Sequence, residues 1–208
     1  MTMNRMEKPS KIGKICVYCG SGPGTDPAFV EAARTFGEIL AKNGIGLVYG
    51  GGGVGIMGAI ARSVHDHGGE VTGIIPKFLM SRERALHGMH ELIATRDMHE
   101  RKQKMFEMAD AFVAMPGGVG TLEEIVEQMT WAQLGRHKKP ILLANINGFW
   151  EPLCALHDHM RTTKFIRGEL NFDLLVADTV GDILPMLQKA ARAVPDAAMT
   201  TAVPDHLL

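Results

Sequence analysis

The chain alternates short apolar runs with segments of helix length, and this alternation restricts its fold more than any other feature of the sequence. Strands buried on both faces read as nearly continuous apolar runs, whereas apolar residues spaced three and four apart indicate helices. These patterns predict strands over residues 14–19, 45–49, 71–75, 91–95, 111–115, 140–145 and 174–177. Helices are predicted over residues 27–43, 56–67, 98–109, 149–161 and 180–193, with one more that ends near Leu134. The alternation predicts an α/β fold, a doubly wound parallel sheet of about seven strands with helices on both faces.

Length and composition agree with one soluble globular domain. The 208 residues fit a single domain, which we place at 14–193 between a disordered lead-in at 1–13 and a loose tail at 194–208. The formal net charge is -1 and no segment gathers Lys and Arg, so nothing indicates nucleic-acid binding. No run approaches ~18 apolar residues, so we expect no contact with a membrane. Three cysteines make no disulfide framework, and the N-terminus lacks an apolar signal core, so we expect a cytoplasmic protein.

Three glycine-rich loops follow predicted strands, at residues 20–26, 50–55 and 116–121. In parallel sheets, ligands bind beyond the carboxyl ends of the strands. All three loops are therefore expected at the same ligand-binding edge.

The loop Pro116–Glu124 (PGGVGTLEE) has the composition of a phosphate cradle. Gly117, Gly118 and Gly120 let the backbone approach a ligand, and the helix that follows offers unpaired amides and the positive end of its dipole. Thr121 adds a hydroxyl. The competing interpretation is a tight turn between strand and helix, but a turn needs one glycine rather than three.

The helix after this loop has two distinct faces. Apolar residues share one face of a helical wheel, namely Leu122, Ile125, Val126 and Met129. The other face carries Glu124, Glu127, Gln128 and Trp131. Because Trp131 is large and apolar, we expect that face to meet a pocket or another subunit, and we take Glu124 as a catalytic candidate.

Two other motifs allow different interpretations. Gly53-x-Gly55-x-x-Gly58 has the literal dinucleotide pattern, but the acidic residue expected at the end of the next strand is missing, so we favour a nucleotide-lining role without NAD. Arg101 and Lys102 flank the apolar face of the helix at 98–109, where Arg101 can reach a phosphate or a carboxylate. The alternative for Arg101 and Lys102 is that their side chains simply extend from the edge of an apolar face into solvent.

We predict no metal site. Cys16 and Cys19 fall within one strand, so their side chains point to opposite faces. The histidine pairs His65/His67 and His157/His159 are two residues apart, a spacing that does not share a helix face.

Taken together, these stretches resemble the LOG ("lonely guy") family of cytokinin riboside 5'-monophosphate phosphoribohydrolases, often labelled lysine decarboxylases. The resemblance rests on Pro116-Gly117-Gly118-x-Gly120-Thr121-x-x-Glu124, on Met98-His99-x-Arg101-Lys102, on residues 130–135 (TWAQLG) and on the two earlier glycine loops. It implies a Rossmann-like fold, a homodimer and a nucleotide substrate. It also implies that Arg101 and Glu124 are the catalytic pair. The substrate contacts implied are Ser21, Gly52, Gly53, Glu83, Arg101, Lys102, Gly117, Gly118, Val119, Gly120, Thr121, Leu122, Glu123, Glu124 and Thr130.

The implied reaction is hydrolysis of the N-glycosidic bond of a nucleoside 5'-monophosphate, AMP or a cytokinin riboside 5'-monophosphate, to free base and ribose 5-phosphate. Cleavage of a glycosidic bond develops positive charge near C1', which a carboxylate such as Glu124 stabilises. The reaction requires no cofactor. A pyridoxal phosphate decarboxylase would need a Schiff-base lysine, and only Lys102 is well placed. The alternatives are a non-catalytic nucleotide-binding or sensor protein and a nicotinamide-dependent oxidoreductase. The segment around Glu83 departs from plant-like members, which bears on the base preferred.

Overall fold

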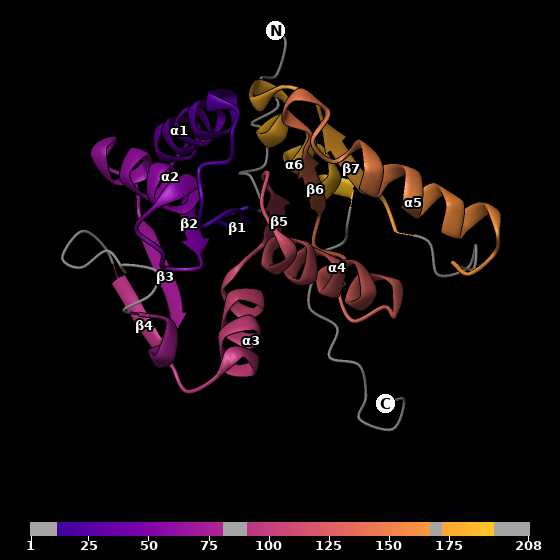
Figure 1. The fold of residues 1–208 in the computed structure, drawn as a ribbon, viewed down its shortest axis with the longest axis horizontal. Helices are drawn as coiled ribbons and strands as arrows, with labels where there is room; N and C mark the ends of the chain where they lie inside the picture. The colour runs from indigo at the N-terminus through magenta and orange to yellow at the C-terminus, as the bar shows by residue number, and fades with distance from the viewer. Residues whose placement is uncertain (1–11, 81–90, 167–171, 194–208) are drawn as a thin grey trace, which may run out of the picture.

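A single parallel sheet forms the centre of the protein (Figure 1). The computed structural model describes residues 12–80, 91–166 and 172–193. In that part of the chain the sheet has seven strands, in the order β4-β3-β2-β1-β5-β6-β7. Their bounds are β1 Lys14–Tyr18, β2 Gly46–Tyr49, β3 Val71–Pro76, β4 Glu91–Thr95, β5 Ala111–Ala114, β6 Ile141–Ala144 and β7 Leu174–Ala177. Every neighbouring pair is parallel, as the alternation of apolar runs and helices predicts.

Helices cover both faces of the sheet, so the predicted doubly wound architecture is confirmed. One face packs against α1 (Pro27–Lys42), α2 (Gly55–Asp66) and α6 (Val180–Ala193). The other packs against α3 (Met98–Met108), α4 (Val119–Gln133) and α5 (Glu151–Thr162). Short 3₁₀ turns occur at η1 (Lys77–Leu79) and η2 (Ile146–Gly148). Each observed end lies within a few residues of its predicted position, because the caps and glycines that mark helix ends are local signals.

The strand order places a topological switch between β1 and β5. The chain runs outward from β1 through β2, β3 and β4, and then returns to the other side of β1 with β5. The loops that follow β1 and β5 therefore leave the sheet in opposite directions and open a crevice at its carboxyl edge. Two of the three glycine-rich loops border this crevice.

The rotation of α4 differs from the helical-wheel prediction. Ile125 and Met129 are buried as expected, but Leu122 and Val126 are 38% and 39% exposed. Thr121, Glu124 and Gln128 are buried in their place. The apolar wheel was wrong here because the inward face of this helix supplies polar groups to the crevice as well as apolar groups to the core.

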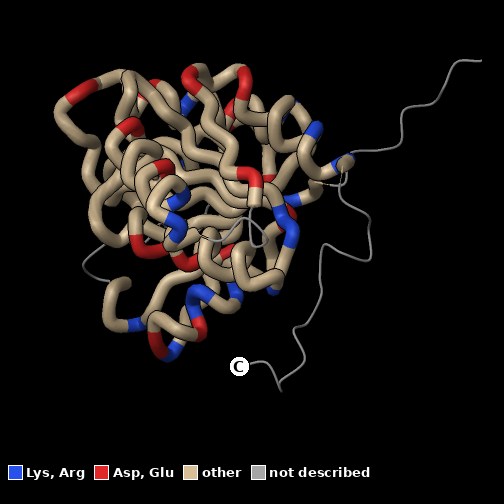
Figure 2. Tube along the Cα trace, turned by 90° about the vertical axis from the view of Figure 1, so that its right-hand side faces the viewer, with Lys and Arg blue, Asp and Glu red and all other residues tan. Residues whose placement is uncertain are grey.

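Charged residues of both signs occur throughout the described part of the chain. Figure 2 shows Lys and Arg interspersed with Asp and Glu along the trace. Among the helices that the structure describes, none combines the length and the apolar character needed to cross a membrane. The first residues that the structure describes are part of the packed body, since Ile12 is 3% exposed and the Gly13 amide donates to Asp110 Oδ2 at 2.8 Å. Residues 1–11 of the lead-in predicted at 1–13, and the predicted tail at 194–208, lie outside the described residues.

Candidate active site

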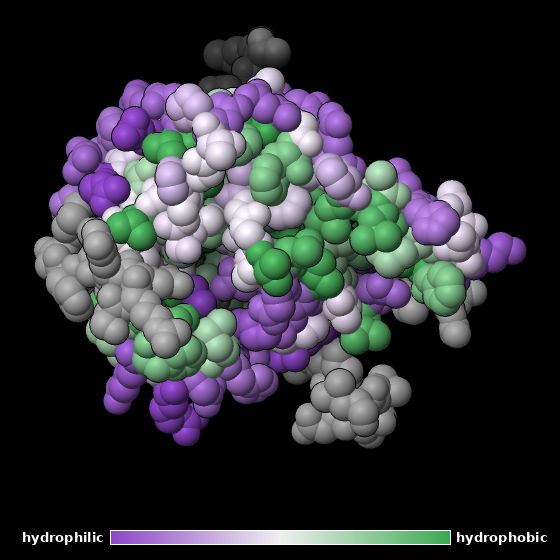
Figure 3. All heavy atoms as spheres, in the orientation of Figure 1, coloured by the Kyte–Doolittle hydropathy of each residue, from purple (hydrophilic) through white to green (hydrophobic). Residues whose placement is uncertain are grey.

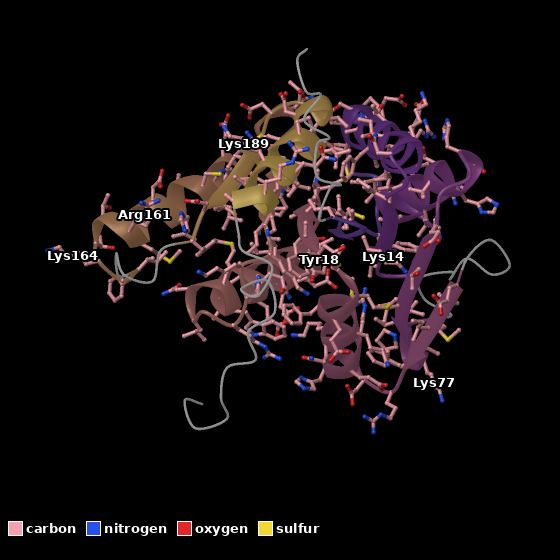
Figure 4. All side chains as sticks on the ribbon, turned by 180° about the vertical axis from the view of Figure 1, so that it is seen from behind. Lys14, Tyr18, Lys77, Arg161, Lys164 and Lys189 are labelled. Atoms are coloured by element: carbon pink, nitrogen blue, oxygen red, sulfur yellow. The ribbon has the colours of Figure 1, made fainter. Side chains whose placement is uncertain are left out.

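A pocket of about 310 Å³ occupies the crevice at the carboxyl edge of the sheet. The loop after β1 and the loop after β5 are joined at its floor, where the Gly20 amide donates to Pro116 O at 3.0 Å. The walls come from β1 and its loop, from the residue after β2, and from the starts of α2, α3 and α4. In Figure 4 Tyr18 is labelled near the centre of the molecule, where the first and second halves of the chain meet. The glycine loops thus meet at one edge, as the sequence predicts.

The first turn of α2 is closed to a ligand by the loop after β1. The Ile56 amide donates to Gly22 O at 3.4 Å, and the Met57 amide donates to Gly20 O at 3.2 Å. Gly55 has a φ of 59°, and a Cβ there would collide with the Ser21 backbone. Packing between loops therefore accounts for the dinucleotide-like glycine pattern, and the amides that would hold a pyrophosphate are already used.

The first turn of α4, in contrast, faces the pocket with free donors. Its first amide with a backbone acceptor is that of Leu122, which donates to Gly118 O at 3.0 Å. No side chain caps the helix at Gly118. In the described chain, the amides of Val119, Gly120 and Thr121 have no backbone acceptor, so they are available to an anion.

The three glycines of this loop serve different purposes. A Cβ on Gly117 would collide with the Thr121 hydroxyl, so packing requires glycine there. A Cβ on Gly118 or Gly120 would have no atom within 4 Å, and neither residue has a positive φ. Both nevertheless line the pocket. The protein itself does not need glycine at these two positions, which is consistent with close approach of a ligand.

Arg101 is fixed beneath the pocket by backbone carbonyls. Its Nε donates to Ile74 O at 3.1 Å, and its Nη2 donates to Gly50 O at 3.4 Å. Gly50 makes this possible, because a Cβ at that position would collide with Nη2. The guanidinium is 6% exposed, and such a buried cation needs several acceptors and a negative partner.

Glu124 is that partner. Its Oε1 lies 3.5 Å from Arg101 Nη2, and the glutamate is 8% exposed. Tyr18 lies on the same side, where burial, the Cys16 thiol and the Glu124 carboxylate together raise the pKa of its hydroxyl well above its usual value. The pocket thus contains an ion-paired carboxylate, a neutral phenol and a row of backbone donors.

Lys102 points away from the pocket toward α4. Its Nζ lies 2.6 Å from Glu123 Oε1 and 2.9 Å from Glu127 Oε1. Partial burial alone would lower the pKa of this ammonium, but the hydrogen bonds to Glu123 and Glu127 outweigh it and raise the pKa. Lys102 is therefore a protonated cation that links the two helices.

The pocket collects about half of the residues predicted to bind substrate. Those that line it are Ser21, Arg101, Gly118, Val119, Gly120, Thr121, Glu123 and Glu124. Those that do not line it are Gly52, Gly53, Lys102, Gly117, Leu122 and Thr130. Gly52 and Gly53 are buried, and the Thr130 hydroxyl donates to Val126 O at 2.9 Å. Glu83 lies outside the described residues.

Several lining residues were not predicted, among them Tyr18, Cys19, Gly50, Met57 and Met98. Met98 was within reach of sequence reasoning, since it opens the motif that contains Arg101. Gly50 was also accessible as the first residue of its glycine loop. Tyr18 and Cys19 gave no signal, because strand residues before a turn resemble ordinary core.

Trp131 does not line the pocket, although Glu124 on the same helix face does. Its ring packs edge-to-face on Phe106 at 5.0 Å between centroids, and the Arg136 guanidinium lies 4.0 Å above it. The size of Trp131 is thus explained by contact with α3 rather than by a ligand.

Cys16 and Cys19 lie on opposite sides of the sheet, as expected from their spacing. Cys16 packs in the core on the α3–α5 side and Cys19 on the α1–α2 side, so the two thiols point to opposite faces. Within residues 12–80, 91–166 and 172–193, no cluster of three or more His, Cys, Asp or Glu could hold a metal ion.

Comparison with known proteins identifies relatives over most of the chain. Residues 57–187 match the model of a family described as "Possible lysine decarboxylase". A rice protein (Oryza sativa subsp. japonica) named cytokinin riboside 5'-monophosphate phosphoribohydrolase LOG is 44% identical over 88% of this chain and 76% of its own length. An Arabidopsis thaliana protein with the same activity name, LOG4, is 42% identical over 89% of this chain and 86% of its own length.

Solved structures with the same fold are more distant in sequence. The molybdenum cofactor carrier protein of Chlamydomonas reinhardtii superposes with a TM-score of 0.65 at 19% identity, over 86% of this chain and 98% of that one. A molybdenum cofactor binding protein of Rippkaea orientalis gives a TM-score of 0.63 at 20% identity, over 88% of this chain and 98% of that one. At this identity the likeness shows a shared Rossmann-like fold.

Proposed function

The chain belongs to the LOG family, and from this premise we propose that it hydrolyses the N-glycosidic bond of nucleoside 5'-monophosphates. The products are the free base and ribose 5-phosphate, and the substrates are AMP, cytokinin riboside 5'-monophosphates or both. The names of the curated relatives support this reaction, and the pocket contains groups suited to it.

The 5'-phosphate binds at the start of α4 in this proposal. The amides of Val119, Gly120 and Thr121 and the positive end of the helix dipole attract an anion there. Gly118 and Gly120 leave room for the phosphate to approach the backbone. Ser21 on the facing loop lines the same pocket and adds a hydroxyl.

Glu124 acts on the ribose, one helical turn beyond the phosphate site. As the bond from C1' to the base breaks, positive charge develops on the sugar, and the ionised carboxylate stabilises it. The carboxylate also orients water, whose oxygen forms the new bond to C1' while a proton passes to the departing base. Arg101 holds the Glu124 carboxylate in place, because its own position is fixed by Ile74 O and Gly50 O.

The observation that carries this proposal is the buried Arg101–Glu124 pair beside an uncapped helix N-terminus. A buried ion pair costs stability unless its geometry is well supported, and such pairs concentrate at functional sites. A purely structural turn would need neither the pair nor the open glycines.

The direct test is a release assay across a panel of nucleotides. The full chain is incubated with AMP, an N6-prenylated AMP, GMP and CMP, and free base and ribose 5-phosphate are quantified. We expect release from at least one adenine nucleotide. Saturable binding in calorimetry without any product would instead support the sensor alternative, and tight binding of NAD(P) would revive the oxidoreductase alternative.

A pyridoxal-dependent decarboxylase fits these residues poorly. A lysine that forms an imine needs a free, unprotonated amine, whereas the pKa of Lys102 is raised by Glu123 and Glu127. Lys139 is buried and its pKa is lowered, but it precedes β6 and so lies at the opposite edge of the sheet from the pocket. Its Nζ donates to Phe106 O at 2.7 Å.

We further propose a homodimer whose interface lies beside the active site. Exposed apolar side chains follow α4 from the pocket, namely Val119, Leu122, Val126 and Leu134. Figure 3 shows hydrophobic side chains gathered across this face, over the region of α4 and α5. Val119 belongs both to this row and to the pocket wall. The cytoplasmic location, and the absence of nucleic-acid and membrane partners, stay predictions from the sequence.

A further inference from the structure

The two helices that carry the proposed catalytic pair are joined by side chains rather than by close backbone packing. α3 and α4 are not among the pairs of elements in extensive backbone contact. Far from the pocket, Phe106 of α3 packs on Trp131 of α4. Near the pocket, the links are the Arg101–Glu124 pair and the bridge from Lys102 to Glu123 and Glu127. The pocket end of this helix pair is thus held by ionic contacts.

The bridge from Lys102 to Glu123 and Glu127 is adjacent in sequence to the proposed catalytic pair. Lys102 follows Arg101 on α3, and Glu123 precedes Glu124 on α4. Because Arg101 is fixed by Ile74 O and Gly50 O, a shift of α4 relative to Lys102 moves Glu124 relative to Arg101. The two carboxylates that hold Lys102 are four residues apart, so they sit one above the other on α4 and grip the ammonium from two sides.

The two carboxylates are not equivalent. The Glu123 side chain is 50% exposed and lines the pocket. An anionic substrate bound there would lie near this carboxylate and could disturb its contact with Lys102. The Glu127 side chain is 23% exposed, lies off the pocket, and has a buried Oε2 with no partner among the described groups. Glu127 is therefore the contact of Lys102 that substrate binding leaves unchanged.

We propose that Glu127 is a positioning residue, which holds Lys102 and thereby sets the separation of Arg101 and Glu124. This inference rests on the proposed hydrolase function. Glu127 does not touch the reacting atoms. The raised pKa of Lys102 supports the arrangement, because it shows that the two carboxylates outweigh the burial of the ammonium.

The first test is a double-mutant cycle read in steady-state kinetics. Displacements of about 1 Å at a catalytic group can cost up to about 100-fold in rate, so we expect Glu127→Gln to lower kcat by roughly tenfold. KM should stay within roughly twofold, because Glu127 makes no contact with substrate. In a Lys102→Met background the same substitution should change kcat by less than roughly twofold, since Glu127 acts through Lys102. A tenfold loss that persists without Lys102, or an unchanged kcat in Glu127→Gln, overturns the proposal.

Two controls separate positioning from folding. Glu107→Gln removes a carboxylate from the other half of the same helix pair, where Glu107 accepts from Gln103 Nε2 at 2.7 Å, and it should leave kcat unchanged. The thermal midpoints of all variants are compared, and if Glu127→Gln does not fold, Glu127→Asp takes its place. Asp keeps the charge at a shorter reach, so an intermediate kcat is expected.

A second test does not depend on activity. The pKa of Lys102 is measured by NMR of ¹⁵N-labelled lysine in the full chain and in Glu127→Gln. Loss of the carboxylate should lower the pKa of Lys102, and an unchanged pKa would refute the proposal that Glu127 holds Lys102. If the wild type releases no base from any nucleotide, the proposed function fails, yet this measurement still decides whether Glu127 holds Lys102.

Discussion

Arg101 Nη2 and Glu124 Oε1 lie 3.5 Å apart, although the two residues belong to different helices and neither is exposed by as much as a tenth. The arginine is held from behind by carbonyls of β3 and of the loop after β2. The carboxylate is therefore presented to the pocket in one orientation, at the point where a helix offers free amides. A catalytic group so placed has little need to reorganise during the reaction.

The first prediction concerns the charge of Glu124. Glu124→Gln keeps the shape and one acceptor but removes the negative charge, so kcat should fall by about 10²–10⁴-fold. Nucleotide binding should persist, since the proposed phosphate site lies in the preceding turn. Release assays and calorimetry on the same preparation measure the two effects. Unchanged turnover would remove Glu124 from the mechanism.

The second prediction contrasts two glycines of one loop. Gly117→Ala forces a methyl group onto Thr121 and should destabilise the fold by about 1–3 kcal/mol. Gly120→Ala meets no atom and sits in a helix, where alanine is favoured by up to about 1 kcal/mol. Its methyl group lies in the proposed phosphate site, so KM should rise by roughly tenfold, about 1.4 kcal/mol.

Denaturant unfolding and steady-state kinetics of the two variants check this contrast. A Gly120→Ala enzyme with a KM like that of the wild type would mean that the phosphate binds elsewhere.

The third prediction concerns His137 and acid stability. His137 Nδ1 accepts from the Lys139 amide at 3.1 Å, and Nε2 lies 3.2 Å from Gln128 O, so the neutral ring protonated on Nε2 satisfies both contacts. Burial lowers its pKa from 6.5 to about 4. The unfolded chain therefore takes up a proton as the pH falls through 6.5, while the folded chain does so only near 4.

Stability is consequently lost between those two values, by up to about 3 kcal/mol from this histidine. Urea unfolding at intervals from pH 7 to pH 4 measures the slope. His137→Gln should flatten it, because glutamine does not titrate. An equal slope in the variant would assign the effect to other groups, such as His157, whose pKa burial also lowers.

The fourth prediction tests the dimer. Val126→Glu places a charge in the exposed apolar row of α4 without touching the pocket, so it should convert a dimer to a monomer. Since Val119 joins that row to the pocket, activity should fall with dissociation. Sedimentation velocity and the release assay follow both properties, with Glu31→Gln on α1 as a surface control. A wild-type chain that is monomeric and fully active would contradict the proposal.

Much of this arrangement could be predicted from the sequence because its signals are local. Gly44, which has a φ of 65°, follows α1 and its cap residue Asn43. The Asp97 carboxylate accepts from the Glu100 amide and so caps the start of α3. Such residues allowed the ends of the helices to be predicted within a few residues. The alternation of strands and helices placed Arg101 and Glu124 at one edge. Parallel strands require that edge to be shared, so topology brings the two residues to the same place, whereas their pairing was implied by the family resemblance.

The remainder depends on tertiary contacts that no local pattern records. The Glu124 face of α4 was expected to meet a pocket or another subunit, and Glu124 lines the pocket. The burial of Gln128, which does not line the pocket, and the partial exposure of Leu122 and Val126 were not predicted, because they run against the polarity of these side chains. Gly50 rather than Gly52 or Gly53 lines the pocket, and its carbonyl accepts from Arg101 Nη2, a contact between distant residues that no local pattern reveals. Lys102 turns from the pocket because two carboxylates on a neighbouring helix attract it.

The carbonyls of Gly20 and Gly22 that occupy the start of α2 have a consequence for protein design. The glycines of the pattern Gly53-x-Gly55-x-x-Gly58 serve here to pack against the loop after β1, which blocks the start of α2. Introducing an acidic residue that binds ribose at the end of β3 would therefore not produce a nicotinamide-dependent enzyme. The loop after β1 would still occupy the position of the pyrophosphate. The segment after β1 would first have to be shortened or rebuilt, and that change would also remove Ser21 from the pocket.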